Sequence, residues 1–472
     1  MRKLKNVIWI VFWLRCVSAG LKAFLPFDLP HIWRQVDTLG VSMRYWLRWT
    51  VEPELRWPLV PAVLNSLDGY SLMPMEFPLL NLIGAPFFAL GATSGRNVAM
   101  LFVFSLYFVL TLLCVRTWQG KKVLNSEADR AFLLLPLIGI SSTFIAKFMP
   151  DYLSMILVLW GVGLIWNDKV RPARMAASLV LMTLGLLVKP TAVTVFLLLL
   201  MRDVNWISKF TRSLWVIPSL LLAGLYYTVG LKWIASLQDT PGLFAVQARA
   251  PLDSVVEFFA EPKQVLRFLM KDLGIGGLPV IYGCVLWLCS AEARKQLLLL
   301  GLAFALQIIA IAALDGSHSF IHSYYHIGTS PLIALGFWLA LTELKHNAEA
   351  TKVIGKRIMI GVLMLAAGAQ IFDTMFFELR SLSSKREHKY VWPNEIDTLK
   401  ARNPDFPWGR GYTFRASRAL AYPNLGILFG EREGSSTAEY GFYLKTDPPP
   451  AGCSVVDDSK SVALVHCVSK VN

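Results

Sequence analysis

The sequence is poor in charged residues and has no cysteine pair at a spacing typical of metal sites. Asp, Glu, Lys and Arg make up 17% of the 472 residues, whereas hydrophobic residues make up 55%. The six cysteines include no CxxC pair, which argues against a zinc module. Cys16, Cys114, Cys284 and Cys289 fall in or beside apolar runs, where isolated thiols behave as small hydrophobes. Internal repeats and low-complexity segments are not evident, so the apolar runs organise the chain.

These apolar runs repeatedly approach the length of roughly 20 residues that crosses a bilayer. The formal net charge of +14 might suggest a nucleic-acid partner, but Lys and Arg stand in short clusters between the runs. Such clusters fix the orientation of a multispanning protein, because basic loops stay on the cytoplasmic side. We therefore predict an integral membrane protein, with membrane lipid as a partner and no nucleic acid.

Alternation of basic and non-basic loops predicts an all-α polytopic protein with about eleven spans, its N-terminus cytoplasmic and its C-terminus periplasmic. A cleaved signal peptide is the alternative for the first span, but Arg15 interrupts its apolar core, which favours an uncleaved helix. The predicted spans are 7–27, 98–115, 131–146, 152–166, two short arms within 175–201, then 214–233, 273–288, 297–314, 327–341 and 358–376.

The two short arms are predicted from the basic flanks of the apolar stretch 175–201. Both flanks should be cytoplasmic, so an even number of crossings separates them. The turn is expected at Lys189-Pro190, because proline lacks the backbone N–H and disfavours helical geometry in the preceding residue. Each arm is too short to cross, so the turn should lie inside a water-filled cavity below the external surface.

Besides an external loop of mixed polarity at 234–272, two larger regions are predicted outside the membrane. The first is the external loop 28–96 of the transmembrane domain 1–377, in which 77–91 should form a helix along the membrane surface. The second is a small periplasmic α/β domain at 378–472. There, Cys453 and Cys467 flank two short apolar segments that read as a hairpin, and an oxidising compartment would allow a disulfide between them.

Unusual polar residues gather at the external ends of the predicted spans. Asp37, the candidate catalytic residue, follows the first span in a stretch rich in aromatic side chains, where a carboxylate is costly and function is the default hypothesis. Its structural alternative is a pair with Arg34 that anchors an interfacial helix. The other candidate ligand-binding residues, which come from four further places in the chain, are Glu76, Asp151, Lys189, His322, Tyr324 and Tyr325.

Each of these residues also has a structural interpretation. The structural alternative for Asp151, which follows Pro150, is a helix cap. The alternative for Glu76 is neutralisation of an arginine, and that for the tyrosines is an interfacial aromatic belt. Lys189, within 27 mostly apolar residues, favours an anionic ligand or a carboxylate partner. The spacing of four between His318, His322 and His326 suggests a metal site only weakly, because Ser-His-Ser is a poor helix former, and we assign no metal ligand.

The order of five short motifs resembles the bacterial GT-C fold glycosyltransferases, relatives of lipid A aminoarabinose transferase and of protein O-mannosyltransferases. The resemblance covers about residues 1–345 and depends on order and sidedness, because each motif alone is weak. The motifs are Arg34-Gln35-x-Asp37-Thr38, Glu76-Phe77-Pro78, Met149-Pro150-Asp151, Lys189-Pro190-Thr191 and His322-x-Tyr324-Tyr325.

The resemblance implies a lipid-phosphate sugar donor, an external active site and inversion at the anomeric carbon. It implies Asp37 as the catalytic acidic residue, with Glu76 and Asp151 as supporting carboxylates and Lys189 at the cavity wall. Two departures stand out: Thr38 replaces a second acid, and Phe77 replaces a lysine that helps hold the lipid phosphate. Phosphate binding would then fall to Arg34, Lys189 or His322.

From these residues and from what the resemblance implies, we predict a protein of the bacterial inner membrane that transfers a sugar from an undecaprenyl-phosphate-type carrier to a periplasmic glycan, lipid or protein acceptor. No cofactor is certain, and a divalent metal ion stays an alternative. Two other functions remain open: an oligosaccharide polymerase or ligase with a diphosphate carrier, and a lipid or solute transporter. A transporter is disfavoured because its paired broken helices and matching halves are not evident.

Overall fold

The structure is a computed structural model of the 472-residue chain. It describes residues 2–24, 32–50, 62–65, 69–72, 76–124, 126–166, 171–201, 214–236, 251–269, 289–316, 320, 322–346, 357–365, 367–369, 371–372, 398–399, 401–403, 412–413, 440–444, 453–458 and 462–467. The predicted span 273–288, His318 and most of 378–472 lie outside these ranges. The side chains of Asp37, Cys453 and Cys467 also lie outside the described part, although their backbones are within it.

Most of the described chain is helical. The α-helices are α1 (Arg2–Lys22), α2 (Ile32–Thr50), α3 (Leu79–Gly84), α4 (Ala92–Trp118), α5 (Ala128–Phe132), α6 (Ile140–Phe144), α7 (Pro150–Leu164), α8 (Pro172–Val188), α9 (Leu197–Leu200), α11 (Ile217–Leu225), α12 (Leu231–Ser236), α13 (Pro251–Phe259), α14 (Pro262–Arg267), α16 (Ala291–Asp315) and α17 (Ser330–His346). The 3-10 helices are η1 (Ala85–Leu90), η2 (Pro190–Phe196), η3 (Leu214–Val216) and η7 (Ser323–Thr329), and η4 (Tyr226–Gly230) is a π-helix.

Four continuous helical segments in the described part are long and apolar enough to cross a bilayer: Ser94–Trp118, Ile217–Ile234, Ala291–Ala313 and Ser323–Leu344. They coincide with the spans predicted at 98–115, 214–233, 297–314 and 327–341. Shorter apolar helices stand beside them, among them α7 and α8. The chain is therefore a multi-pass membrane protein, whereas the total of eleven spans stays a prediction.

The predicted span 131–146 is not one helix. Helix α5 ends at Phe132, turns follow, and α6 begins at Ile140 after Gly139, whose φ of 71° lies in the left-handed region that favours glycine. The freed backbone groups are satisfied locally, since the Ser141 hydroxyl donates to the Leu135 carbonyl at 2.6 Å. An irregular segment at membrane depth is tolerated when protein covers it, and nearly all of this one is buried.

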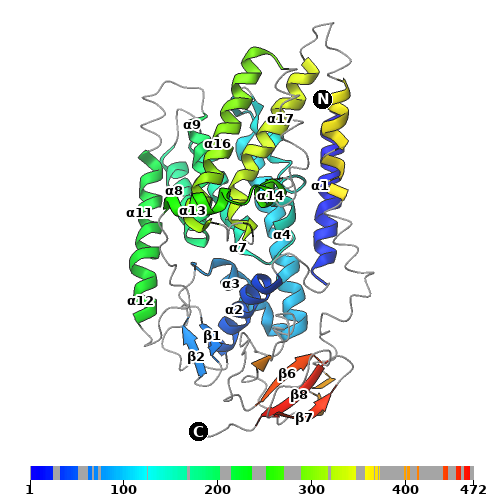
Figure 1. The fold of residues 1–472 in the computed structure, drawn as a ribbon, viewed down its shortest axis with the longest axis vertical. Coiled ribbons are helices and arrows are strands. Elements are labelled where there is room, and N and C mark those ends of the chain that lie inside the picture. Colours follow the sequence, from blue (N-terminus) through cyan, green and yellow to red (C-terminus); the bar gives the residue numbers. More distant parts are fainter. Residues whose placement is uncertain are drawn as a thin grey trace.

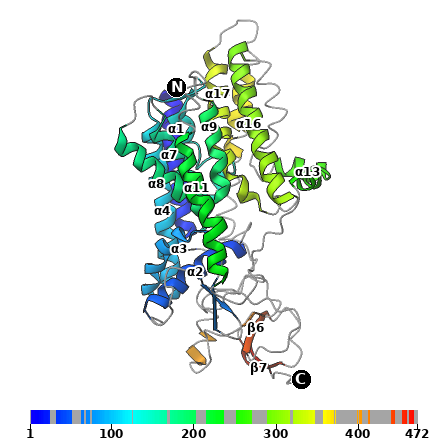
Figure 2. The same cartoon turned by 90° about the vertical axis from the view of Figure 1, so that its left-hand side faces the viewer.

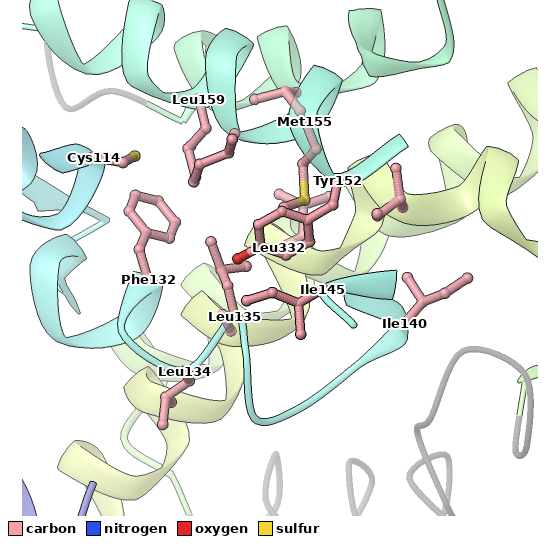
Figure 3. Packing of buried hydrophobic residues seen from close by; sticks show 14 of the residues in the cluster. Cys114, Phe132, Leu134, Leu135, Ile140, Ile145, Tyr152, Met155, Leu159 and Leu332 are labelled. Atoms are coloured by element: carbon pink, nitrogen blue, oxygen red, sulfur yellow. The ribbon is translucent and has the colours of Figure 1, made fainter. Parts of the chain in front are cut away.

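The core forms where α4, the 131–146 segment, α7 and α17 meet. Figure 3 shows Phe132, Tyr152 and Leu332 from three of these elements packed together. Helices α7 and α8 approach closely, because a Cβ at Gly161 or at Gly185 would lie 2.6 Å from a side chain of the facing helix. Small residues at such a crossing let backbones approach, as is common between membrane helices.

The strands form three small sheets: β1 (Ala62–Asn65) with β2 (Gly69–Leu72), β3 (Lys122–Val123) with β4 (Ser126–Glu127), and β5 (Tyr412–Thr413), β6 (Tyr440–Leu444), β8 (Val462–Cys467) and β7 (Cys453–Asp458) in that spatial order. The hairpin predicted around the two cysteines is confirmed, since Cys453 and Cys467 are direct partners across antiparallel β7 and β8. The disulfide stays a prediction. Figures 1 and 2 place this sheet and the N-terminus at opposite ends of the molecule.

Candidate active site

The predicted break in the apolar stretch 175–201 is confirmed. Helix α8 ends at Val188, Lys189 is extended with φ of −159° and ψ of 113°, and η2 begins at Pro190. Because Pro190 has no N–H to donate, the last carbonyls of α8 need other partners. The break therefore exposes both a lysine side chain and a set of backbone acceptors.

Neighbouring elements satisfy these acceptors. The Ser154 hydroxyl, on α7, donates to the Gly185 carbonyl at 2.7 Å and to the Lys189 carbonyl at 3.0 Å. The Leu187 carbonyl accepts the Phe77 backbone N–H at 2.9 Å and the Tyr227 hydroxyl at 2.7 Å. These donors come from α7, from the Glu76-Phe77-Pro78 motif and from η4, so three other parts of the chain hold the break in a defined structure.

At this break, Glu76 pairs with two buried cations. Its Oε2 lies 2.9 Å from Nη2 of Arg34, on α2, and its Oε1 accepts a hydrogen bond from Nζ of Lys189. The side chains of Arg34 and Lys189 are 6% and 4% exposed, and that of Glu76 is 19% exposed. We call these three residues the Glu76 cluster; they carry one net positive charge within the protein.

The two cations keep Glu76 ionised. Burial alone would raise the pKa of its carboxyl, but the charges of Arg34 and Lys189, with the Lys189 hydrogen bond, outweigh burial and hold that pKa well below its ordinary value of 4.5. A carboxylate that satisfies two cations fixes their position. The Glu76 cluster is therefore a permanent arrangement of charges across the physiological pH range.

Aromatic side chains from η7 cover Lys189. Its Nζ lies 5.5 Å from the centre of the Tyr324 ring and 5.3 Å from that of Tyr325, within the range of cation–π attraction. The Tyr324 hydroxyl pairs with Nδ1 of His322 at 2.9 Å, and the His322 and Tyr325 ring centroids are 5.5 Å apart. The motif His322-x-Tyr324-Tyr325 thus meets Lys189 although more than one hundred residues separate them.

Asp151 lies at the beginning of α7 and is fully buried. The charges of Lys189, Arg34 and Glu76 all act on it, which places it beside the Glu76 cluster. Neither of its carboxylate oxygens has a side-chain hydrogen-bond partner among the described residues. The N-cap of α7 is Met149 with no side-chain cap, so Asp151 does not serve as the N-cap residue.

Asp37 follows Arg34 by three residues in α2, which places its backbone about one turn further along that helix. The next residue, Thr38, is tied in place: its hydroxyl donates to the Arg34 carbonyl at 2.7 Å, and its carbonyl accepts the Asn81 amide at 2.5 Å. Asn81 belongs to α3, which follows the Glu76 motif. Helix α2 is therefore held on both sides of Asp37, by the Arg34–Glu76 pair on one side and by the Asn81 bond from α3 on the other.

The structure brings together Arg34, Glu76, Lys189, His322, Tyr324 and Tyr325, with Asp151 beside them. The structural interpretation of Glu76 also holds, because it does neutralise Arg34. Sequence reasoning missed Ser154, Tyr226 and Tyr227. The ring of Tyr226 lies 6.0 Å from that of Phe77, and both tyrosines begin the π-helix η4. A tyrosine pair inside an apolar span was the available signal, and π-turns are frequent at functional sites.

A divalent metal ion finds little support in these side chains. Among the described residues, no three His, Cys, Asp or Glu side chains are grouped as a metal site requires. The histidine spacing does not build one either, because the buried His326 contacts the Phe268 ring, with centroids 4.6 Å apart, whereas His322 pairs with Tyr324. Glu76 is already held by two cations. The participation of a divalent metal ion stays an alternative predicted from the sequence.

Comparison with solved structures identifies the fold. No protein-family model and no curated protein matches the sequence. The chain is similar in structure to ArnT from Cupriavidus metallidurans, a lipid A aminoarabinose transferase, over 99% of both chains in the apo state, with a TM-score of 0.58 and 13% identity. Against ArnT bound to undecaprenyl phosphate the cover is 98% of both chains, the TM-score 0.56 and the identity 12%.

These similarities define a class: the chain has the GT-C fold of membrane glycosyltransferases along its whole length. The fold expected from the five motifs is thereby confirmed. At this level of identity the shared property is the fold, and the activity has to be argued from the site itself.

Proposed function

We propose that the protein is a membrane glycosyltransferase that moves a sugar from a polyprenyl-phosphate carrier to a cell-envelope glycan, lipid or protein on the periplasmic side. The single observation that carries this proposal is the Glu76 cluster, two buried cations fixed by one carboxylate at the helix break. A full-length GT-C fold and a solved relative that holds undecaprenyl phosphate support it.

The chemistry requires cations near the leaving group. In a polyprenyl-phosphate sugar the phosphate bears one negative charge, and when the bond from the anomeric carbon to the phosphate oxygen breaks, the lipid phosphate leaves with two. Preorganised cations stabilise this growing charge most effectively where water is excluded. Arg34 and Lys189 supply them, since both are almost fully buried. The Lys189 ammonium has three N–H donors and Glu76 takes one.

A base is needed on the opposite side of the sugar. The acceptor hydroxyl attacks the anomeric carbon, a new carbon–oxygen bond forms as the bond to the phosphate breaks, and the hydroxyl proton moves to a carboxylate. We assign this role to Asp37, which lies one helical turn from Arg34, and the configuration of the sugar is inverted. Tyr324, Tyr325 and His322 form the aromatic wall against which the sugar ring would pack.

The test is Asp37→Asn in purified protein, with transfer measured from a polyprenyl-phosphate sugar and separately from a polyprenyl-diphosphate oligosaccharide. We expect loss of transfer by a factor of about 10² to 10⁴, the usual contribution of a general base, with an unchanged melting temperature. Asp253→Asn, on the external loop of mixed polarity, is the matched control and should keep full activity.

Three outcomes would contradict the proposal. Full transfer by the Asp37→Asn variant would remove Asp37 as the base. Turnover of the diphosphate donor alone would favour a polymerase or ligase. Movement of lipid across vesicles with neither donor consumed would favour a transporter.

A further inference from the structure

A mainly apolar cavity with charged residues at its edge lies at the other end of the bundle from the Glu76 cluster. It has a volume of about 250 Å³ and is framed by α1, the end of α4, α5 and α17. The lining residues are Ile8, Trp9, Leu112, Val115, Arg116, Gln119, Asp129, Arg130, Leu133 and Trp338.

The cavity has an apolar wall beside a lipid-like surface. Ile8, Leu112, Val115 and Leu133 line it, whereas the next turns of the same two long helices expose large apolar side chains outward. Those exposed side chains are Ile10, Trp13 and Leu14 on α1, with Val109 and Leu113 on α4. In a multi-pass membrane protein such side chains face the acyl chains. A ligand in this cavity therefore has lipid as its immediate neighbour.

Charges of both signs line the same cavity. Arg116 is exposed, Asp129 and Arg130 are half-buried, and Arg130 pairs with Glu127 at 2.5 Å. Trp338 is 1% exposed, and its indole N–H has no hydrogen-bond partner among the described residues. Two guanidinium groups favour a phosphate, which they bind through planar pairs of N–H donors, whereas a carboxylate beside them favours an ammonium group.

The side of the membrane follows from the basic residues around this end. The first turns of α1 contain Arg2, Lys3 and Lys5, and Lys121 and Lys122 follow α4 directly. Clusters of this kind remain in the cytoplasm. Pockets between membrane helices that carry basic residues on that side bind phospholipid head groups.

We propose that this cavity binds the head group of an amino-phospholipid from the cytoplasmic leaflet, such as phosphatidylethanolamine. Arg116 and Arg130 hold its phosphate, Asp129 accepts from its ammonium group, and its acyl chains leave along the exposed faces of α1 and α4. The site is separate from the sugar-transfer site, and it does not depend on the proposed activity.

The test is native mass spectrometry of the full-length protein after purification from nanodiscs of phosphatidylcholine with added phosphatidylethanolamine or phosphatidylglycerol. The wild-type protein should retain phosphatidylethanolamine in preference to both other lipids. At about a fivefold loss for each basic residue, Arg116→Ala with Arg130→Ala should weaken retention by about 25-fold. Asp129→Asn should keep phospholipid binding but lose the preference for phosphatidylethanolamine over phosphatidylglycerol.

Two control variants separate the site from general charge and from misfolding. Arg171→Ala with Arg174→Ala removes the same charge from exposed positions at the start of α8 and should retain the lipid. Val115→Phe fills the cavity with both arginines in place and should lose the lipid. Equal retention by the Arg116/Arg130 variant would overturn the proposal, as would equal retention of phosphatidylcholine or protection of the detergent-purified protein by inorganic phosphate alone.

Discussion

The polar groups at the two ends of α7 differ in their hydrogen-bond partners. At its last turns the carbonyls accept side-chain donors: the Trp118 indole donates to Leu159 at 3.1 Å and the Lys121 ammonium to Gly163 at 2.5 Å. At its first turn, Asp151 is fully buried and its carboxylate oxygens have no side-chain partner in the described structure. One end carries side-chain donors that match its acceptors, and the other carries an acceptor group without a side-chain donor among the described residues.

The difference places an electrostatically unfavourable group, the buried Asp151 carboxylate, at the first turn of α7. Burial of a carboxylate without hydrogen bonds costs free energy, and such groups in native proteins usually have a functional reason. The regular end of α7 also contacts aromatic rings, with Trp118 and Trp166 centroids 4.8 Å apart, which is packing typical of a stable core. We infer that the paired end contributes stability and the unpaired end contributes to ligand binding.

Substitution of one lysine at each end of α7 tests most directly whether the two ends differ in function. Lys189→Met removes a cation beside the first turn of α7 and should lower transfer by about 10² to 10³, the loss found when one charge-stabilising donor is removed. Lys121→Met removes the donor at the other end and should keep transfer while it loses about 1 kcal/mol of stability. Sugar transfer and thermal unfolding measured on both variants separate the roles. Equal effects of the two substitutions on transfer would mean that the ends do not differ in function.

Asp151→Asn tests whether the unpaired carboxylate opposes folding. The amide has the same shape without the charge, so we expect a stability increase of about 1 kcal/mol together with a transfer loss of about tenfold or more. Thermal unfolding and transfer rates on the same preparation measure both. Asp253→Asn, which changes an exposed carboxylate in the first turn of α13, is the control and should change neither. A destabilised Asp151→Asn protein would show that the carboxylate is paired and structural.

Trp118→Phe tests the paired end. The variant loses the indole hydrogen bond to Leu159 and part of a fully buried ring, which should cost about 1 to 3 kcal/mol. Transfer should remain unchanged at temperatures where the protein is folded. Trp13→Phe is the control, because Trp13 is exposed on α1 and its replacement should be almost neutral. Reduced transfer in folded Trp118→Phe protein would connect the two ends.

The sequence alone predicts the features that depend on local backbone chemistry or on the order of the spans. It does not predict those that depend on how the helices pack. The break at Lys189-Pro190 was predictable because proline has a local and unconditional effect on the helix. The meeting of Arg34, Glu76 and Lys189 was predictable as a group, because alternating spans place their ends on one side. The contacts themselves were not, since which cation approaches which carboxylate oxygen depends on helix rotation and packing.

Two errors have a common physical origin. The segment 131–146 is as apolar as a span, so hydropathy alone predicts one helix; the left-handed Gly139 and the hydroxyls of Ser141 and Ser142 were the signals of a break. Tyr226 and Tyr227 were missed because hydropathy counts them as part of a span. An apolar segment is expected to be buried, but its sequence does not distinguish burial in lipid from burial within the protein.

The smallest expected effect is on the acid side of the pH profile of sugar transfer. Arg34 and Lys189 hold the pKa of Glu76 well below 4.5 against the opposing effect of burial, so Glu76 stays ionised wherever the protein is active. A lowered pKa contributes stability above the unfolded value, and that contribution is lost only as the pH falls toward the folded value. Transfer measured from pH 5 to 8 should therefore show an acid limb that does not come from Glu76, and Glu76→Gln, although slower, should have the same normalised profile. A displaced acid limb in that variant would mean that Glu76 takes up a proton during turnover, and the first turn of α7 would then face a titrating carboxyl in place of a fixed charge.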